Sequence, residues 1–535
     1  MKTRPAARPT SISLSLLAVI AVGAWGAGAP ARACRPGDAN TFCADLDSPD
    51  VINSAEPDGR FGAAVAFGDF NGDGTLDLAV GAPGQSSGKG RVFVFYTSGK
   101  ALVAQEMNAI LNTYGGPDTD AGFGSALAAA DFDLDGFDDL AVGAPRQDLQ
   151  DLFGNCVGDT CSDAGVVHYM RGSAEGLLDT LRVFLEPPDR TFNMHYGAAL
   201  AAGKVTNSGA PVLAIGIPDS PGDGLFGRPG RVEVRQANGP SVPQVVATLQ
   251  VAYPGGEADG DEQGAALVVG RFAQLPDRQL VYAAPGSAVA GTNGAGRIEV
   301  ASYDGASFEA IEEFVQTDFG SAGNSTGSRF GAALAVGDFD RDGLLDLAVG
   351  APDRDLTGGL NRAGRVYIAF GFATGLTTTR FQVFQEDSFP GQAGADQERF
   401  GAALAGGDFD GDTFDDLAIG APGEGGTDTG FVFLAWGTGT GLDVDAAKGI
   451  NFSQSFVQGT NAADDNFGSV LAAKDLEHLP TADGPDELAI GVPAKDVGAD
   501  ADAGMVYVTR KLDPAWVFAD GFESNGTAVW TTTVP

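Results

Sequence analysis

Four short segments of this chain place oxygen-bearing side chains at spacings that suit a metal ion. In each segment, positions 1, 3, 5 and 9 carry Asp or Asn, and position 7 offers a backbone carbonyl. Calcium prefers several hard oxygen ligands of this kind, without nitrogen or sulfur. The four predicted ligand sets, each with its position-7 residue last, are Asp69, Asn71, Asp73, Asp77 and Thr75; Asp131, Asp133, Asp135, Asp139 and Phe137; Asp338, Asp340, Asp342, Asp346 and Leu344; and Asp408, Asp410, Asp412, Asp416 and Phe414.

The composition of these four acidic loops favours a bound cation over a solvated turn. Carboxylates a few ångströms apart repel one another, and a divalent cation reverses the sign of that interaction. Position 6 is glycine in three loops but Thr413 in the fourth, where we expect a weaker site. An EF-hand needs Glu at position 12, whereas the residues there are Val80, Val142, Val349 and Ile419. We therefore predict about four calcium ions in loops of another type, and an irregular further site formed by Asp475, Asp483 and Asp486 stays open.

The acidic loops belong to a unit that the chain repeats seven times. Each unit has a Phe-Gly or similar step, an apolar run, a loop, a second apolar run and a closing proline; these prolines are Pro83, Pro145, Pro218, Pro285, Pro352, Pro422 and Pro493. A glycine and a period-two apolar run follow, as in GRVYIAF at 364–370, which predicts a third strand, and a weaker fourth strand precedes the next unit. The repeat predicts an all-β fold, a seven-bladed β-propeller of four-stranded antiparallel blades.

The repeat also predicts the limits of the propeller and the way its ring closes. The seventh unit ends without an evident fourth strand, and an additional strand-like segment, Asp47–Asn53, precedes the first unit. We therefore expect this N-terminal segment to complete the last blade by pairing with Gly504–Thr509, because an unpaired edge is a liability in a sheet. The predicted propeller spans 34–512, with repeats around 61–96, 123–170, 196–235, 263–301, 330–370, 400–436 and 467–509.

The Phe-Gly step, the DxDxDGxxD loop and the Gly-Ala-Pro breaker together resemble FG-GAP repeats. Such repeats form the propeller at the head of integrin α chains and occur in many bacterial secreted proteins. The resemblance covers residues 44–512 and implies calcium between the first two strands of a blade. The resemblance is highly specific for the fold and much less specific for the function, because one fold hosts many activities.

The ends of the chain predict export. Residues 1–33 combine basic residues, an apolar run at Ile12–Val22 and a small-x-small motif ending at Ala33, which is typical of a secretory signal peptide. We expect a secreted protein, with periplasm or cell surface as alternatives, and no membrane span. Two local disulfides, Cys34–Cys43 and Cys156–Cys161, are predicted, and lipidation of Cys34 stays open as an alternative to the first. The tail, 513–535, is a docking signal or a frayed end.

The net charge excludes some partner classes. The chain carries 71 acidic and 32 basic residues, for a net charge of −39. Such a surface repels nucleic acid and favours cations, so we expect no nucleic-acid partner. With three histidines and no CxxC spacing, the chain shows no zinc motif.

Three functions remain open from the sequence. The first is a monomeric calcium-binding module for adhesion to a protein or surface ligand, because propeller loops gather on one face and suit recognition. The second is a carbohydrate-binding lectin, which needs exposed aromatic residues. The third, which we disfavour, is a polysaccharide-active lyase or hydrolase, since no nucleophile motif stands out. The candidate aromatics for the lectin are Tyr253, Tyr303 and Trp436.

Overall fold

The computed structural model of this chain describes most of the repeat region and β1, the N-terminal strand. The described residues are 43–47, 56–98, 101–105, 120–150, 160–205, 209–220, 229–237, 242–250, 260–274, 279–303, 308–444, 451–453, 462–474, 485–497 and 500–509. Within them the secondary structure is almost entirely strand, with three short turns of 3₁₀ or π type and no α-helix. No helix among these residues has the length and apolar character that a membrane crossing requires.

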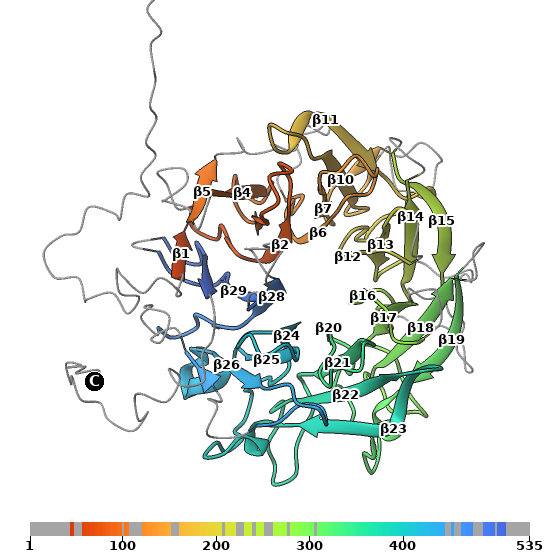
Figure 1. Ribbon diagram of the computed structural model, residues 1–535, viewed down its shortest axis with the longest axis vertical. Coiled ribbons are helices and arrows are strands. Elements are labelled where there is room, and N and C mark those ends of the chain that lie inside the picture. The colour runs from red at the N-terminus through yellow and green to blue at the C-terminus, as the bar shows by residue number, and fades with distance from the viewer. Residues whose placement is uncertain are drawn as a thin grey trace, which may run out of the picture.

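Seven four-stranded antiparallel sheets are arranged around a central axis, which confirms the predicted seven-bladed propeller (Figure 1). We number the blades in chain order. The strands of the first four blades are β2 (Ala64–Gly68), β3 (Asp77–Ala82), β4 (Arg91–Ser98) and β5 (Ala101–Gln105); β6 (Ala126–Ala130), β7 (Asp139–Ala144), β10 (Val166–Arg171) and β11 (Leu178–Leu185); β12 (Ala199–Gly203), β13 (Val212–Ile217), β14 (Arg231–Gln236) and β15 (Gln244–Leu249); and β16 (Leu267–Gly270), β17 (Gln279–Ala284), β18 (Arg297–Tyr303) and β19 (Phe308–Phe314).

The remaining blades follow the same order. Their strands are β20 (Ala333–Gly337), β21 (Asp346–Ala351), β22 (Arg365–Phe372) and β23 (Gly375–Phe384); β24 (Ala403–Gly407), β25 (Asp416–Ala421), β26 (Phe431–Ala435) and β27 (Asn451–Phe452); and β28 (Val470–Lys474), β29 (Glu487–Val492), β30 (Met505–Thr509) and β1 (Cys43–Asp47). The connections hold the small sheet β8 (Leu149–Gln150) with β9 (Thr160–Cys161), and the turns η1 (Gln316–Phe319), η2 (Glu386–Ser388) and η3 (Glu424–Asp428).

The second strand of each blade is buried along its whole length, in agreement with its continuous apolar sequence. The hydrophobic core is therefore divided into clusters, several of which join two neighbouring blades. One cluster, for example, joins Ile368 of blade 5 to Leu417 of blade 6. The outer strands are much more exposed, as β19 shows. Stability of this ring depends on contacts between blades as much as on pairing within them.

The Phe-Gly step of one blade contacts the Gly-Ala-Pro segment of the blade before it. Phe400 is fully buried, and its amide donates to the Ala363 carbonyl of blade 5 at 3.0 Å. The next residue, Gly401, lies so close to Gly350 that a Cβ on Gly350 would stand 2.1 Å from the Gly401 carbonyl oxygen. The two backbones thus touch, which explains why both motifs contain glycine at this contact.

We expect Gly350→Ala to destabilise the protein by about 1–3 kcal/mol, as overpacking does in a well-packed core. The added methyl group must push blades 5 and 6 apart, since the atom that it meets belongs to the backbone. Gly323→Ala is a matched control, because a Cβ there meets no atom within 4 Å. Denaturant midpoints measure both variants, and equal midpoints for the two would contradict this account of the contact.

The last blade contains the N-terminal strand. β1 pairs antiparallel with β30, from Cys43 opposite Thr509 to Asp47 opposite Met505. The segment predicted for this role, 47–53, overlaps β1 only at Asp47, and its other residues lie outside the described part of the chain. The paired strand therefore lies upstream of the predicted one.

Several predictions about the ends and the cysteines fall outside the described residues. These include the signal peptide at 1–33, the tail at 513–535, and Cys34 and Cys156. Both disulfide pairings therefore remain predictions. Cys161, on β9, is fully buried in the core cluster that blades 1 and 2 share.

Candidate metal centres

Each acidic loop joins the first and second strands of its blade. The four loops follow β2, β6, β20 and β24, and each ends at the first residue of the next strand. Because all four connect equivalent strands, they lie at the same end of the propeller. Blades 1 and 2 are neighbours in the ring, as are blades 5 and 6, so the loops form two adjacent pairs.

The aspartate at position 1 folds the loop around its own carboxylate. In blade 5, Asp338 accepts hydrogen bonds from the amides of Asp342, at 2.9 Å, and Gly343, at 3.0 Å. Asp69, Asp131 and Asp408 accept equivalent bonds in the other three loops. Local bonds of this kind are a general property of Asp in turns. They bring the side chains at positions 3 and 5 back toward position 1.

The aspartate at position 9 anchors the loop to the blade. Asp346 is fully buried and accepts hydrogen bonds from the Phe339 amide at 3.0 Å and the Gly371 amide at 2.8 Å. Its carboxylate thus connects the loop to the end of the third strand. The equivalent residues, Asp77, Asp139 and Asp416, make the same two kinds of contact.

Burial of the position-9 carboxylates makes their ionised form costly. Burial, opposed by hydrogen bonds and reinforced by neighbouring aspartates, raises the pKa of Asp77 and Asp139 to about 7 and that of Asp346 to about 8. The same causes raise the pKa of Asp416 well above its ordinary value. A cation between these carboxylates would favour their charged form. A bound cation would therefore stabilise the folded conformation of these loops.

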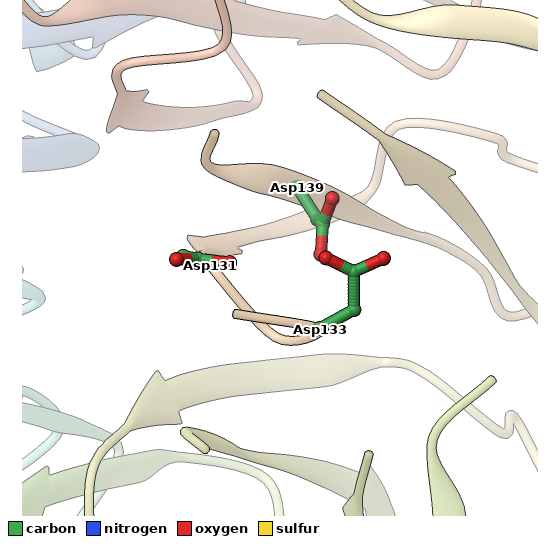
Figure 2. A group of neighbouring side chains, drawn as sticks. All are labelled: Asp131, Asp133 and Asp139. Atoms are coloured by element: carbon green, nitrogen blue, oxygen red, sulfur yellow. The ribbon is translucent and has the colours of Figure 1, made fainter. Parts of the chain in front are cut away.

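Three of the loops bring carboxylate oxygens within 4.8 Å of one another. The converging groups are Asp131, Asp133 and Asp139; Asp338, Asp340 and Asp342; and Asp408, Asp410 and Asp416. Figure 2 shows the carboxylates of Asp133 and Asp139 pointing toward each other, with Asp131 at the start of the same loop. In the blade 1 loop, position 3 is Asn71, which offers an amide oxygen instead. The part played by the position-7 carbonyls of Thr75, Phe137, Leu344 and Phe414 stays a prediction.

The blade 2 loop contains a buried oxygen that lacks a donor. Asp133 is 3% exposed, and its Oδ1 atom has no hydrogen-bond partner among the described residues. Its other oxygen lies 3.5 Å from Nε of Arg171. An unsatisfied buried carboxylate oxygen is expensive. The donor set of this loop therefore fits a hard cation at the point where the carboxylates converge.

Arginine side chains offset part of the charge at position 3. In blade 5, the Arg380 guanidinium forms an ion pair with Asp340 and lies over the Phe370 ring, 3.9 Å from its centroid. Arg171 stands in the corresponding relation to Asp133 in blade 2. These contacts hold the position-3 carboxylates in place.

Thr413 replaces the position-6 glycine in the blade 6 loop and keeps the same backbone conformation. Its φ is 77°, in the left-handed region that glycine occupies in the other three loops. That conformation is strained for a β-branched residue. This backbone strain is a physical reason to expect a weaker site in the blade 6 loop.

Sequence reasoning missed a second set of acids, at position 8. Asp415 of blade 6 accepts a hydrogen bond from the Asp338 amide of blade 5 at 2.7 Å, and its own amide donates to the Asp338 carbonyl at 3.3 Å. Asp138 and Asp486 form the same reciprocal pair with Asp69 and Asp408. Each position-8 acid therefore positions the first ligand of the loop in the preceding blade.

The distribution of this acid follows the distribution of the acidic loops. It occurs in three of the four blades that come after an acidic loop, and blade 3, with Pro211, is the exception. Blades 1, 4 and 5, which come after a blade without an acidic loop, have Leu76, Arg278 and Leu345 at position 8. The Asp-Asp doublets at 138–139 and 415–416 were the available sequence signal. For the irregular site left open in blade 7, Asp475 and Asp483 lie outside the described residues, and Asp486 acts as a position-8 acid.

The candidate lectin aromatics do not form an exposed platform among the described residues. Trp436 is fully buried among core residues of blades 6 and 7, which excludes it as an exposed ring for sugar binding. Tyr303 is half-buried and packs on Phe308, with ring centroids 5.0 Å apart. Tyr253 lies outside the described residues.

Comparison with known proteins identifies the repeats. The FG-GAP repeat model matches residues 61–95, 123–169, 330–368 and 400–434. The chain therefore contains FG-GAP repeats, as the sequence resemblance implied. These four segments are the blades that carry the acidic loops.

The relatives are much longer than the matched region. Bovine phosphatidylinositol-glycan-specific phospholipase D is 35% identical over 173 residues, which cover 31% of this chain and 19% of the relative. Integrin alpha-PS5 of Drosophila melanogaster is 35% identical over 168 residues, covering 30% of this chain and 15% of the relative. A solved exotype rhamnogalacturonan lyase aligns with a TM-score of 0.41 and 14% identity, over 84% of this chain and 72% of that one. The chain thus covers less than a fifth of either sequence relative.

Proposed function

We propose that this FG-GAP repeat propeller is an exported, calcium-stabilised binding module that recognises a protein or surface ligand as a monomer. The observation that carries the proposal is the convergence of carboxylates in the loops at one end of the ring. Calcium suits these loops because their side-chain donors are hard oxygens at flexible spacing. When bound, the ion would neutralise charge and hold each loop in one conformation.

The orphaned oxygen of Asp133 supports a cation in blade 2, and the other loops share its backbone pattern. Position 1 would supply the first ligand, and the buried aspartate at position 9 would join the ion to the second strand. The acid at position 8 supports the first ligand from the next blade. A bound ion would thereby stiffen the contact between two blades as well as one loop.

A binding role fits the composition of the end of the ring that carries the loops. Leu134, at position 4 of the blade 2 loop, is 50% exposed, and Phe372, beside the β22–β23 turn, is 58% exposed. Both side chains are available for apolar contact with a ligand held at this end of the ring. The relationship to integrin α chains points to a protein ligand.

The test of the binding role uses the full chain with and without calcium. We expect capture of a protein ligand from a panel of purified extracellular proteins in calcium, and loss of capture in chelator. A glycan array run in parallel tests the lectin alternative. Turnover in a screen of polysaccharides and glycosyl-phosphatidylinositol substrates would contradict a purely binding role and favour an enzyme, a class that the phospholipase D relationship keeps open.

We expect Asp415→Leu to weaken calcium binding at the blade 5 loop about tenfold, while every proposed ligand stays in place. The substitution leaves the part-buried Asp338 amide without its acceptor, and the loss of such a bond costs about 1–3 kcal/mol. Calcium titration by calorimetry should show the same number of sites, one of them weaker.

Asp486→Leu provides the control, since Asp486 supports Asp408 and not Asp338. It should weaken the blade 6 site and leave the blade 5 site unchanged. An Asp415→Leu variant with all sites at wild-type affinity would show that position 8 has no part in positioning the ligand.

A further inference from the structure

At the other end of the propeller, three glutamates from two connections meet between blades 5 and 6. Glu386 begins η2 and Glu398 precedes the Phe-Gly step, both in the connection from β23 to β24, whereas Glu424 begins η3 in the connection from β25 to β26. One carboxylate oxygen from each lies within 4.8 Å of the others. The acidic loops lie at the opposite end of the same strands, so this cluster is a separate feature.

The three glutamates are buried or half-buried, and none of them forms an ion pair within the part of the chain that the structure describes. Glu386 and Glu398 are each 3% exposed, and Glu424 is half-buried. The Oε2 atom of all three lacks a hydrogen-bond donor among the described residues. The arginines next to these segments in sequence make their printed contacts with other groups, Arg365 with Gln385 and Arg399 with Asp353. A buried group of like charges is strongly unfavourable unless a cation or protons neutralise it.

The neighbouring junctions have a positive side chain at the equivalent position. Glu424 lies two residues after the closing proline of its blade, where blade 7 has Lys495 and blade 5 has Arg354. The Lys495 ammonium forms a buried ion pair, 2.6 Å long, with Asp465, which is the equivalent of Glu398.

The junction between blades 4 and 5 shows the same arrangement with other residues. Arg354 donates to the Oε1 atom of Gln316, the equivalent of Glu386. Gln316 in turn donates to Oγ of Ser328, the equivalent of Glu398, at 2.6 Å. In both neighbours, therefore, a cationic side chain occupies the place that Glu424 takes between blades 5 and 6, and it contacts a polar side chain of that junction.

We propose that Glu386, Glu398 and Glu424 bind a divalent cation from solution, which replaces the lysine or arginine of the neighbouring junctions. The donor set is three carboxylates, which favours calcium, magnesium or manganese over softer metals. Calcium suits the cluster best, since its ligands come from irregular connections that are not fixed in octahedral geometry. The ion joins the fourth-strand side of blade 5 to the second-strand side of blade 6.

Protons are the competing way to neutralise this cluster. Burial and the neighbouring carboxylates raise the pKa of Glu386 to about 10 and that of Glu424 to about 7. If protons neutralise the cluster, no ion is bound there, and substitution of the glutamates with glutamine leaves the number of bound ions unchanged. Counting bound ions therefore distinguishes a protonated cluster from a metal-bound one.

The experiment counts ions on the full chain by equilibrium dialysis against calcium, and then manganese. The double variant Glu386→Gln with Glu424→Gln should lose about one bound ion relative to wild type, because amides are poorer ligands for a hard cation. A companion variant, Asp410→Asn with Asp412→Asn, removes the same number of charges from the acidic loop of the same blade and should lose the ion of that loop while the glutamate cluster keeps its own. An unchanged ion count in the glutamine variant overturns the proposal.

A third variant tests the comparison between junctions. Glu424→Lys copies blade 7 and should lose about one ion while melting at a higher temperature than wild type in chelator, because the ammonium group supplies the missing charge. A Glu424→Lys variant that keeps the wild-type ion count overturns the proposal, and this variant also serves if the glutamine variant fails to fold. If the acidic loops bind no metal, only the loop variant keeps the wild-type count, so the two proposals fail separately.

Discussion

Removal of calcium is expected to lower the melting temperature of this protein by about 5 °C. Extracellular calcium modules have dissociation constants of about 10⁻⁴ to 10⁻³ M. At a concentration tenfold above that constant, each site stabilises the folded state by about 1.4 kcal/mol. Four loops together contribute roughly 5–6 kcal/mol. In a propeller of this size, whose unfolding entropy is about 1 kcal/mol per kelvin, each kcal/mol shifts the melting temperature by about 1 °C.

The effect is large because the cation acts on groups that are buried. Asp346 and its equivalents begin the second strands, which form the most buried part of each blade. Without a cation, their burial favours protonation, and the repulsion among the aspartates opposes the loop conformation. The position-8 contacts transmit that strain to the next blade.

Thermal melts in calcium, in chelator and in chelator with restored calcium measure this effect. Asp340→Asn together with Asp342→Asn should remove about a quarter of the shift, because one of four equivalent sites is lost. Dialysis at millimolar calcium should find about four ions in the loops. Fewer than two ions, or identical melting curves with and without chelator, would mean that the loops are ordinary solvated turns.

The fold was predictable from the sequence because its strongest signal is repeated. A single run such as DLAVGA at 346–351 fits a buried strand or a buried helix segment. Seven such runs at similar spacing, each with a breaker and a second strand pattern, leave few other architectures. This repeat signal gives no guidance at the N-terminus, where no repeat fixes the register of the strand. The paired strand there is 43–47, upstream of the predicted 47–53.

The acidic loops were predictable for the same reason, whereas the groups that support them were not. The partners of Asp415 and Glu424 are defined by contacts across blades, which no local pattern reveals. Comparing equivalent positions among the repeats recovers part of this information, since Lys495 and Arg354 stand where Glu424 stands. The sequence left Trp436 open as either an exposed aromatic or a core residue, and only the packing of blades 6 and 7 decides that its ring is fully buried.

Phe400→Ala is expected to destabilise the protein by about 3–5 kcal/mol, the cost of removing a fully buried aromatic ring. Its ring lies between Phe389, at 5.8 Å, and Phe433, at 5.3 Å, measured between centroids. Those two rings contact each other as well, 5.1 Å apart. The three rings form the centre of the core cluster between blades 5 and 6.

The cost should fall at the upper end of this range, because the site cannot collapse around the cavity. Residues 400 and 401 are held by backbone hydrogen bonds to Ala363 of the preceding blade and Gly420 of their own. Phe372→Ala is the matched control: this ring is 58% exposed, so its removal should change the free energy of unfolding by about 0.5 kcal/mol or less. Equal shifts in the denaturant midpoint for both variants would show that the Phe-Gly step does not hold the blades together, and the role of the motif in ring closure would have to be assigned to its glycine alone.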